Sequence, residues 1–348
     1  MRFLERALLP FVHGMDPEKA HNMTLQALNW GVIPRPGPYT STRLTTEIAG
    51  LKLPNPIGLA AGLDKNAEAI YPLLRTGFGF IEVGAATPKP QPGNPKPRLY
   101  RLTEDRAAIN RFGFNNDGMD VISGRLRNRV DSGIVGLNLG ANKASQHRTI
   151  DYVKVLETCG PYVDFATINV SSPNTERLRE LQGREPLYGL VKGAMETRDS
   201  FEHPIPIFLK VAPDIDERMI EDVIEVARMT KIDALICTNT TIKRAGLKSE
   251  HAAQKGGLSG APLFDLSNKV LAQFARGVGN EVPLIGVGGV ASGQDAYTKI
   301  RLGASAVQLY TALVFEGFSV VKKIAKDLDT LLEADGFDHV SQAVGIDL

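Results

Sequence analysis

The sequence predicts an α/β protein: a (β/α)8 TIM barrel preceded by an N-terminal extension of two helices. Eight short apolar segments recur along the chain, and most are followed by a polar or glycine-rich turn and then a helix-like stretch. Continuous apolar runs between helices are typical of parallel strands buried on both faces, and eight such strands close a barrel. An open, doubly wound sheet is the alternative topology for the same alternation.

The predicted strands share this apolar character and lie at Pro56–Ala60, Phe80–Val83, Ile134–Leu139, Phe165–Val170, Ile205–Val211, Ala234–Cys237, Leu284–Val287 and Ala306–Leu309. The clearest helix-like stretches between them are Glu217–Met229 and Asp265–Arg276. Two longer segments leave this alternation. Residues 87–116 are rich in proline and include a possible antiparallel insert at Arg98–Leu102, while Ser171–Pro186 is either a solvated loop or a lid over a site.

Residues 1–36 read differently from the rest and are predicted to form a helical hairpin. Apolar residues recur at helical spacing in a first helix, and Asp16-Pro17-Glu18 has the pattern of a second helix start: an N-cap, proline at the first position and acid in the first turn. Gly31 and Pro34 end it. The first helix carries Phe3, Leu4, Ala7, Leu8 and Phe11, and the second Ala20, Met23, Ala27 and Trp30. The hairpin is either a packing cap on the barrel, which we place at 37–348, or an amphipathic element that lies on a bilayer.

Composition excludes several classes of protein. The 348 residues include 40 basic and 39 acidic ones, and this balance argues against broad recognition of nucleic acid. The two cysteines and the scattered histidines predict neither a disulfide framework nor a metal site. No apolar stretch approaches the roughly 18 residues of a membrane-spanning helix, and no signal or transit peptide is expected.

Polar residues follow the predicted strands at the point where each one ends. In a barrel these carboxyl ends meet on one rim, where barrel enzymes keep their active sites. The sequence therefore predicts one shared site, built from Lys65, Ala85, Asn138, Asn169, Ser172, Lys210, Thr238-Asn239-Thr240, Gly288-Gly289 and Tyr310-Thr311.

Lys210 is the most informative of these residues, because it places an ammonium inside an apolar strand. A buried cation needs an anion nearby or must lose its charge. A cofactor that becomes anionic on reduction meets that need; the alternative is a lysine that extends from the strand end into solvent. Glycines at 286–289 and 256–260 are weak indications of a phosphate site in flexible loops.

Taken together, the motifs resemble dihydroorotate dehydrogenase, a flavin enzyme family of pyrimidine (UMP) biosynthesis. The resemblance covers nearly the whole chain. It rests on motifs that are each weak but in this order highly specific, at Asn55–Lys65, Pro92–Leu99, Asn110–Asn115, Asn169–Thr175, Gly256–Gly260 and Gly286–Gly289.

The resemblance implies oxidation of dihydroorotate to orotate, with Ser172 as the catalytic base. It places FMN against Ala61, Gly62, Lys65, Ala85, Asn138, Asn169, Lys210, Thr238, Gly260, Gly289, Tyr310 and Thr311. It assigns dihydroorotate to Lys65, Asn110, Arg111, Phe112, Gly113, Phe114, Asn169, Asn174, Asn239 and Thr240. Ala85 departs from the pattern, since some relatives have threonine there.

The resemblance also selects a branch of the family. The cytosolic branch uses cysteine as base and lacks the N-terminal extension, whereas this chain has Ser172 and the hairpin. These features resemble the quinone-dependent branch, with His21, Arg101 and Tyr310 near the quinone. We therefore expect a monomer associated peripherally with the cytoplasmic face of the cell membrane. A barrel lyase or isomerase acting on a sugar phosphate and a non-catalytic membrane scaffold are the alternatives.

Overall fold

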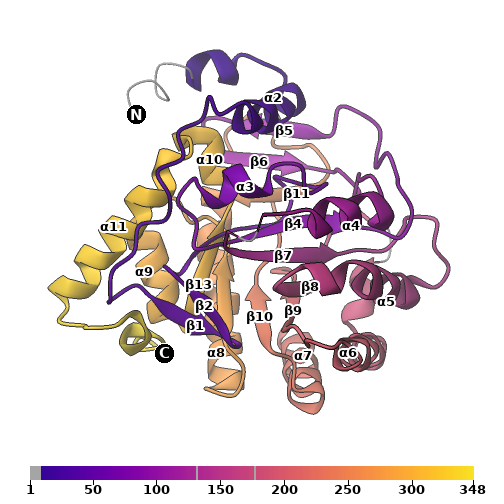
Figure 1. The fold of residues 1–348 in the computed structure, drawn as a ribbon. Coiled ribbons are helices and arrows are strands. Elements are labelled where there is room, and N and C mark those ends of the chain that lie inside the picture. Colours follow the sequence, from indigo (N-terminus) through magenta and orange to yellow (C-terminus); the bar gives the residue numbers. More distant parts are fainter. Residues whose placement is uncertain (1–8, 131, 176–177) are drawn as a thin grey trace.

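Eight parallel strands close into a barrel in the computed structural model, which describes residues 9–130, 132–175 and 178–348 (Figure 1). The strands follow one another around the barrel in chain order, and each of the predicted apolar segments coincides with one of them. They are β3 (Ile57–Leu59), β4 (Phe80–Ala86), β7 (Ile134–Leu139), β8 (Phe165–Asn169), β9 (Ile207–Val211), β10 (Ala234–Cys237), β12 (Leu284–Val287) and β13 (Ala304–Leu309). The predicted barrel is confirmed, and the open sheet is wrong.

Alternation along each strand divides the barrel interior from the surrounding helices. On β9, Phe208 belongs to the interior cluster, whereas Leu209 packs outward. The ring of Phe208 stacks on that of Phe165 with centroids 4.8 Å apart. A Cβ on Gly136 would lie 2.1 Å from the Phe165 ring, so only glycine fits beside it. Aromatic side chains thus fill the part of the barrel interior that lies toward the amino-terminal ends of its strands.

A short antiparallel hairpin closes the amino-terminal end of the barrel. Strands β1 (Thr46–Ile48) and β2 (Leu51–Leu53) pair with each other. Ile48 and Leu53 join the interior cluster of Phe80, Phe165 and Phe208. The sequence analysis did not predict this hairpin, and it leaves the carboxyl-end rim as the open end of the barrel.

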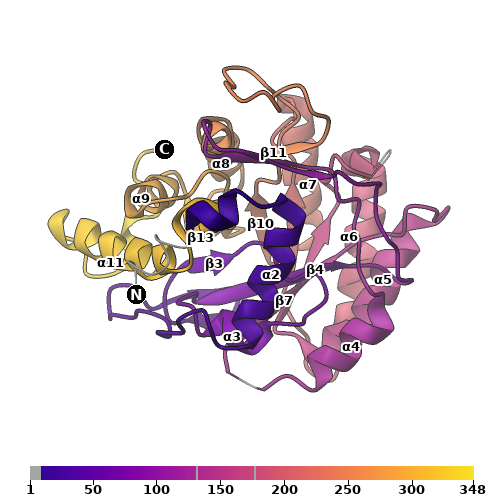
Figure 2. The ribbon, with the colours of Figure 1, turned by 90° about the horizontal axis from the view of Figure 1, so that it is seen from above.

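Helices surround the barrel, as the view from above shows (Figure 2). They are α3 (Ile70–Leu74), α4 (Met119–Arg127), α5 (Arg148–Cys159), α6 (Arg184–Asp199), α7 (Glu217–Thr230), α8 (Phe264–Val278), α9 (Gly293–Arg301), α10 (Thr311–Glu316) and α11 (Ser319–Ala334), with short 3-10 turns at Gly160–Tyr162, Leu178–Gln182, Ala261–Leu263 and Val340–Ala343. The two predicted helices at 217–229 and 265–276 are confirmed as α7 and α8. None of the helices in the described ranges is long and apolar enough to cross a membrane.

The predicted second N-terminal helix is confirmed as α2 (Pro17–Asn29), which lies across the open rim (Figure 2). The Asp16 carboxylate accepts the backbone N–H of Lys19 at 2.9 Å, as expected of an N-cap. Residues 9–13 are also helical, while Phe3, Leu4, Ala7 and Leu8 of the predicted first helix lie outside the described residues.

A second sheet covers part of the rim and consists of β5 (Leu99–Leu102), β6 (Ala107–Asn110) and β11 (Gly257–Gly260). The antiparallel insert at 98–102 is confirmed. The prediction of a flexible loop at 256–260 is wrong, because Gly257 and its neighbours pair with β6. A Cβ on Gly257 would lie 2.0 Å from the Thr240 hydroxyl, so this glycine permits close packing of the strand.

Candidate active site

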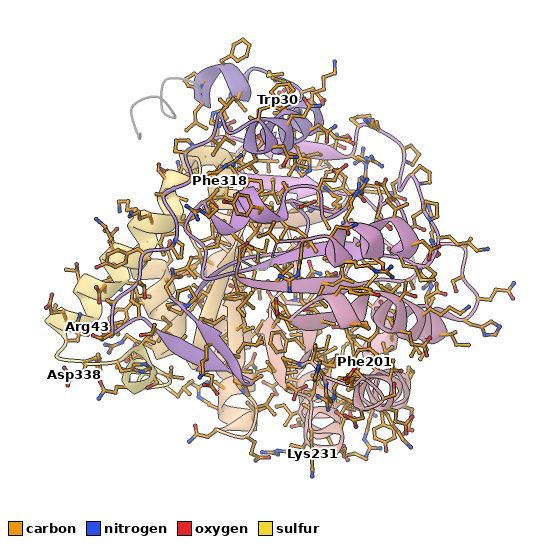
Figure 3. All side chains as sticks on the ribbon, in the orientation of Figure 1. Trp30, Arg43, Phe201, Lys231, Phe318 and Asp338 are labelled. Carbon is orange, nitrogen blue, oxygen red and sulfur yellow. The ribbon has the colours of Figure 1, made fainter. Side chains whose placement is uncertain are left out.

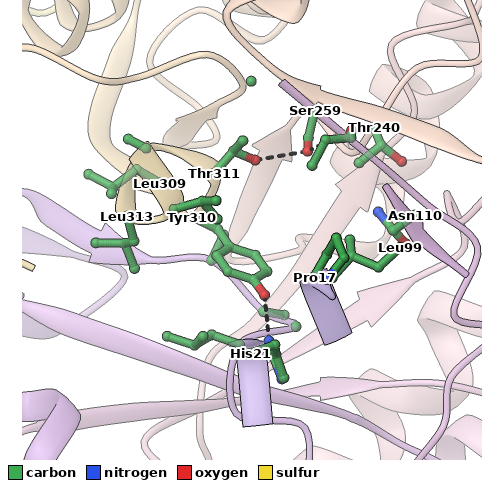
Figure 4. A pocket seen from close by; sticks show the side chains of 18 of the residues that line it. Pro17, His21, Leu99, Asn110, Thr240, Ser259, Leu309, Tyr310, Thr311 and Leu313 are labelled. Atoms are coloured by element: carbon green, nitrogen blue, oxygen red, sulfur yellow. Dashed lines mark hydrogen bonds between the residues drawn. The ribbon is translucent and has the colours of Figure 1, made fainter. Parts of the chain in front are cut away.

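A cavity of about 670 Å³ lies between the barrel rim and the N-terminal helices. Its barrel side is polar and is formed by residues at the strand ends. Its other side is apolar and is formed by residues 9–34 together with α10. Figure 4 shows where the two sides meet, with His21 from α2 facing Tyr310 at the end of β13.

A chain of amide side chains spans the polar side. Asn169 Nδ2 donates to Asn138 Oδ1 at 2.8 Å, and Asn239 Nδ2 donates to Asn169 Oδ1 at 3.2 Å. Asn239 Nδ2 also donates to Ser171 Oγ at 3.0 Å. These contacts join the ends of β7 and β8 to the segment after β10. The remaining lone pairs and N–H groups of the chain offer matched donors and acceptors to a polar ring.

Lys210 points from β9 into the same cavity and is buried. Burial lowers the pKa of its ammonium, and the negative charge of Glu82 raises it in part. Within the described chain, the Lys210 ammonium forms no ion pair shorter than 4.0 Å. The ammonium of Lys210, which the sequence indicated, therefore lies in the interior of the site.

Lys65 links the polar side to the hairpin. Its ammonium lies 3.3 Å from His21 Nε2 and 4.2 Å from the centroid of the Phe112 ring. Burial lowers the pKa of Lys65 to about 8, and burial with the nearby Lys65 charge lowers the pKa of His21. A lysine ammonium only donates, so Nε2 of the neutral His21 accepts and its Nδ1–H donates to the Tyr310 hydroxyl at 2.9 Å (Figure 4).

Ser172 lies at the polar side on the segment that follows β8. Its side chain is buried, and its Oγ accepts the backbone N–H of Asn174 at 3.3 Å. Asn174 Nδ2 donates to Asn110 Oδ1 at 3.1 Å, which ties this segment to the end of β6. A hydroxyl and two amides from two separate segments thus converge on one wall.

Glycines shape a third part of the wall. The backbones of Gly260 and Gly289 have φ values of 98° and 76°, and a Cβ on Gly289 would lie 2.6 Å from Phe264 Cβ. Thr311 Oγ1 donates to Ser259 Oγ at 2.8 Å beside them (Figure 4). These residues lie just after the last two barrel strands and at the end of β11, and barrels commonly bind phosphate in the loops after those two strands through backbone N–H groups.

Two arginines, at and just before β5, connect the N-terminal helices to the rest of the protein. The Arg98 guanidinium donates to the Glu18 carboxylate at 2.8 Å, and both side chains are buried. Arg101 Nη1 donates to the carbonyl oxygen of His13 at 2.7 Å, and Arg101 lines the cavity. These contacts therefore hold both N-terminal helical segments against β5 and the residue before it, in the sheet that covers the rim.

Nearly all of the sequence-predicted site residues line this one cavity; Arg111 does not. The Arg111 guanidinium lies 4.9 Å from the centroid of the Tyr100 ring, and its N–H groups donate to Pro97 and Lys255 carbonyl oxygens. The residues brought together are Ala61, Gly62, Lys65, Ala85, Asn110, Phe112, Gly113, Phe114, Asn138, Asn169, Ser172, Asn174, Lys210, Thr238, Asn239, Thr240, Gly260, Gly289, Tyr310 and Thr311, with His21 and Arg101 from the proposed quinone set.

The sequence analysis missed two kinds of residue at this site. Glu82 and Gln308 are polar side chains inside predicted apolar strands, the same signal that drew attention to Lys210. Ser259 had no signal beyond its glycine-rich neighbourhood. Within the described residues, no three His, Cys, Asp or Glu side chains gather as metal ligands would.

The barrel and its cavity define a class of protein, a (β/α)8-barrel enzyme with a polar site that opens into an apolar chamber. The model of the dihydroorotate dehydrogenase family matches residues 43–332. The chain belongs to the dihydroorotate dehydrogenase family, as the resemblance predicted.

Its relatives extend this similarity to the whole chain. A protein of Cereibacter sphaeroides named dihydroorotate dehydrogenase (quinone) is 59% identical over 346 residues, which cover 99% of this chain and 98% of the relative. A protein of Rhodospirillum rubrum with the same name is 46% identical and covers 98% of this chain and 94% of its own length. The crystal structure of DHODH from Eimeria tenella in complex with ferulenol superposes with a TM-score of 0.92 at 37% identity, covering 97% and 98% of the two chains.

Proposed function

We propose that the protein oxidises (S)-dihydroorotate to orotate through bound FMN and passes the electrons to a membrane quinone. The observation that carries this proposal is the single cavity, which joins an amide- and lysine-lined wall to an apolar chamber under the N-terminal helices. Relatives of 46–59% identity are named for the same reaction. Family membership leaves the sugar-phosphate and scaffold alternatives without support.

The wall of the cavity fits FMN. Gly260, Gly289 and Thr311 line the part of the cavity where we expect backbone N–H groups to bind the phosphate. Lys210, which has no ion-pair partner among the residues that the structure describes, supplies an ammonium to the ring. Ala85 lines the cavity at an irregularity in the pairing of β4 with β7, which supports a contact with FMN through its backbone rather than through a threonine hydroxyl. When bound, FMN supplies an acceptor of two electrons from dihydroorotate and a donor of them to the quinone.

The chain's own residues bind and orient dihydroorotate. Lys65 carries the charge that pairs with its carboxylate, and Asn110, Asn174 and Asn239 match the donors and acceptors of its ring. Ser172 Oγ takes the proton from C5 while the hydrogen on C6 leaves with its electron pair. A serine hydroxyl is a weak base, so its own proton must pass onward through water or hydroxyl groups. Burial of Ser172 limits competing solvent at this point.

The apolar side of the cavity accepts the quinone. His21 and Tyr310 form a hydrogen-bonded pair at its inner end, and Arg101 lies at its wall. Outside, Phe11, Trp30 and Val32 are at least 66% exposed on or beside the N-terminal helices, and Figure 3 shows Trp30 at the surface next to α2. Exposed apolar residues on helices that cover an apolar opening support peripheral association with a membrane.

An anaerobic absorbance titration tests the proposal. The purified protein is expected to show a flavin spectrum that bleaches on addition of dihydroorotate and returns on addition of a quinone. A sugar phosphate serves as control and is expected to leave the spectrum unchanged. A colourless protein that still folds, or a flavin that dihydroorotate does not bleach, would contradict the proposal.

A further inference from the structure

Lys299 on α9 is a fully buried lysine that does not line the cavity. Its ammonium donates to Ser267 Oγ at 2.8 Å and to Asn268 Oδ1 at 2.7 Å, both on α8. It also lies 5.0 Å from the centroid of the Phe264 ring, at the start of the same helix. Burial lowers the pKa of Lys299 to about 7, which shows that this position is unfavourable for a charge and requires a reason.

Ser267 connects this ammonium to the glycine turn that follows β12. A lysine ammonium only donates hydrogen bonds, so Ser267 Oγ accepts from Lys299 and keeps its own proton for a carbonyl oxygen. The hydroxyl shares that proton between the carbonyl oxygen of Gly288, at 3.2 Å, and that of Phe264, at 2.9 Å. The carbonyl of Gly288 is therefore held toward α8.

A peptide group that is held by its carbonyl also has a fixed N–H direction. The peptide bond between Gly288 and Gly289 is trans, so its C=O and N–H groups point in opposite directions. Because the carbonyl faces Ser267 on α8, the N–H of Gly289 points away from that helix. Both glycines line the cavity, and Ser267 does not.

This turn needs a restraint from outside its own backbone. Gly288 and Gly289 have φ values of 113° and 76°, and a Cβ on Gly288 would lie 2.8 Å from Ser267 Oγ. Close packing against α8 therefore requires glycine at this point. Two successive glycines rotate more freely than any other pair of residues, so their own conformational preferences do not fix the direction of the peptide between them. The hydrogen bond from Ser267 supplies that restraint.

We propose that Lys299 and Ser267 are positioning residues for the phosphate of FMN, because they hold the Gly288–Gly289 peptide so that the Gly289 N–H faces that phosphate. This inference rests on the proposed function, which places the phosphate at this turn. Neither side chain lines the cavity, so both act on the flavin only through the peptide. Riboflavin has the same ring and ribityl chain without the phosphate, and its binding therefore gains nothing from them.

Competition between the two flavins tests the inference. The FMN-loaded, full-length protein is dialysed against mixtures of FMN and riboflavin, and the bound flavins are quantified by chromatography. The wild type is expected to prefer FMN by roughly a hundredfold, since hydrogen bonds to a charged group are strong. In Ser267→Ala and in Lys299→Met this preference is expected to fall roughly tenfold. Lys269→Met, the same change at an exposed position of α8, is the matched control and is expected to keep the wild-type preference.

The ratio of the two bound flavins separates positioning from a general weakening of the fold. A variant with a weakened fold would lose FMN and riboflavin in equal proportion, and an unchanged preference in both folded variants would overturn the inference. A wild type that binds the two flavins equally would overturn it even where neither variant folds. Because Lys299 acts through Ser267, adding Lys299→Met to Ser267→Ala is expected to change the preference little further. Failure of the proposed function is a separate result, because it would appear beforehand as absent flavin or absent bleaching by dihydroorotate.

Discussion

Ser172 has a buried hydroxyl that lines the cavity and accepts a hydrogen bond from the Asn174 backbone N–H. Removing it takes away the proposed base without opening the flavin site. Ser172→Ala is expected to slow anaerobic flavin reduction by roughly 10²–10⁴-fold. Stopped-flow absorbance gives the rate, and the flavin content is expected to stay unchanged.

Ser200→Ala serves as the control for that experiment, since it removes a hydroxyl that caps the end of α6 on the far side of the molecule. Reduction of Ser172→Ala at the rate of this control would exclude Ser172 as the base.

The lowered pKa of Lys65 predicts that the binding of orotate depends on pH. Burial lowers the pKa of its ammonium to about 8, so the positive charge is present below that pH and lost above it. The carboxylate of the ligand stays ionised throughout this range. The affinity for orotate, measured by perturbation of the flavin spectrum, is therefore expected to fall as the pH rises through about 8.

Lys65→Met is expected to bind orotate weakly and without this pH dependence. Lys192→Met, which alters an exposed lysine on α6, is expected to behave as the wild type. Orotate binding by the wild type that is constant across this range would contradict the assignment of Lys65 to the carboxylate.

The sequence showed that a charged residue interrupts an apolar strand, but it did not show which side chains such a charge contacts. Lys210 stood out because an ammonium interrupts an apolar run. Glu82 meets Asn138 and Gln308 only because the barrel register brings β4, β7 and β13 together, and no local pattern encodes that register. Arg111 illustrates the opposite case: its place within a motif predicted a site role, yet its side chain turns to Tyr100.

Among the elements, the N-terminal helices have a proposed role that can be tested directly, which is contact with the membrane. Phe11 and Trp30 are 69% and 77% exposed, and neither lines the cavity. Their joint replacement by glutamine is expected to reduce binding to lipid vesicles severalfold, because apolar area that a bilayer would bury is lost. Co-sedimentation with vesicles measures binding.

Reaction of the same double variant with dihydroorotate and a soluble dye is expected to be unchanged. The matched control replaces Ile150 and Met229, exposed apolar residues on α5 and α7, by glutamine. Equal loss of vesicle binding in both double variants would mean that the N-terminal helices do not form the membrane contact.

Elements with a periodic pattern were predicted, and those defined by long-range pairing were not. The eight barrel strands were predicted from their apolar runs, and α2 from the helix-start pattern of Asp16 and Pro17. The hairpin β1–β2 has three-residue strands, too short for alternation to show. Strand β11 consists of Gly257-Leu258-Ser259-Gly260, whose glycines indicate a loop until β6 supplies a partner.

At the scale of the whole molecule, the buried pair of Glu18 and Arg98 joins the N-terminal helices to the barrel. Removing one partner of a buried pair leaves an uncompensated charge, so Glu18→Gln is expected to lower the free energy of unfolding by about 3 kcal/mol. Urea denaturation measures the loss. The exposed Glu47→Gln is the control.

The same pair predicts how this loss depends on pH. Burial raises the pKa of Glu18, but hydrogen bonds and charge from Arg98 and Lys96 outweigh it, so the pKa lies below its ordinary value. The stabilisation is therefore present above that ordinary value and is lost as the pH falls through the lowered pKa. The difference between wild type and Glu18→Gln is expected to vanish in acid; a difference that persists there would contradict the ion-pair explanation.

The small hairpin β1–β2, which closes the bottom of the barrel, has a consequence for biogenesis. With that end closed, we expect the proposed FMN to enter through the rim, and α2 lies across the rim. We therefore expect the apoprotein to receive its flavin before the N-terminal helices dock. The N-terminal helices would then take their place after the barrel that they cover, and protein without flavin would keep their apolar faces undocked.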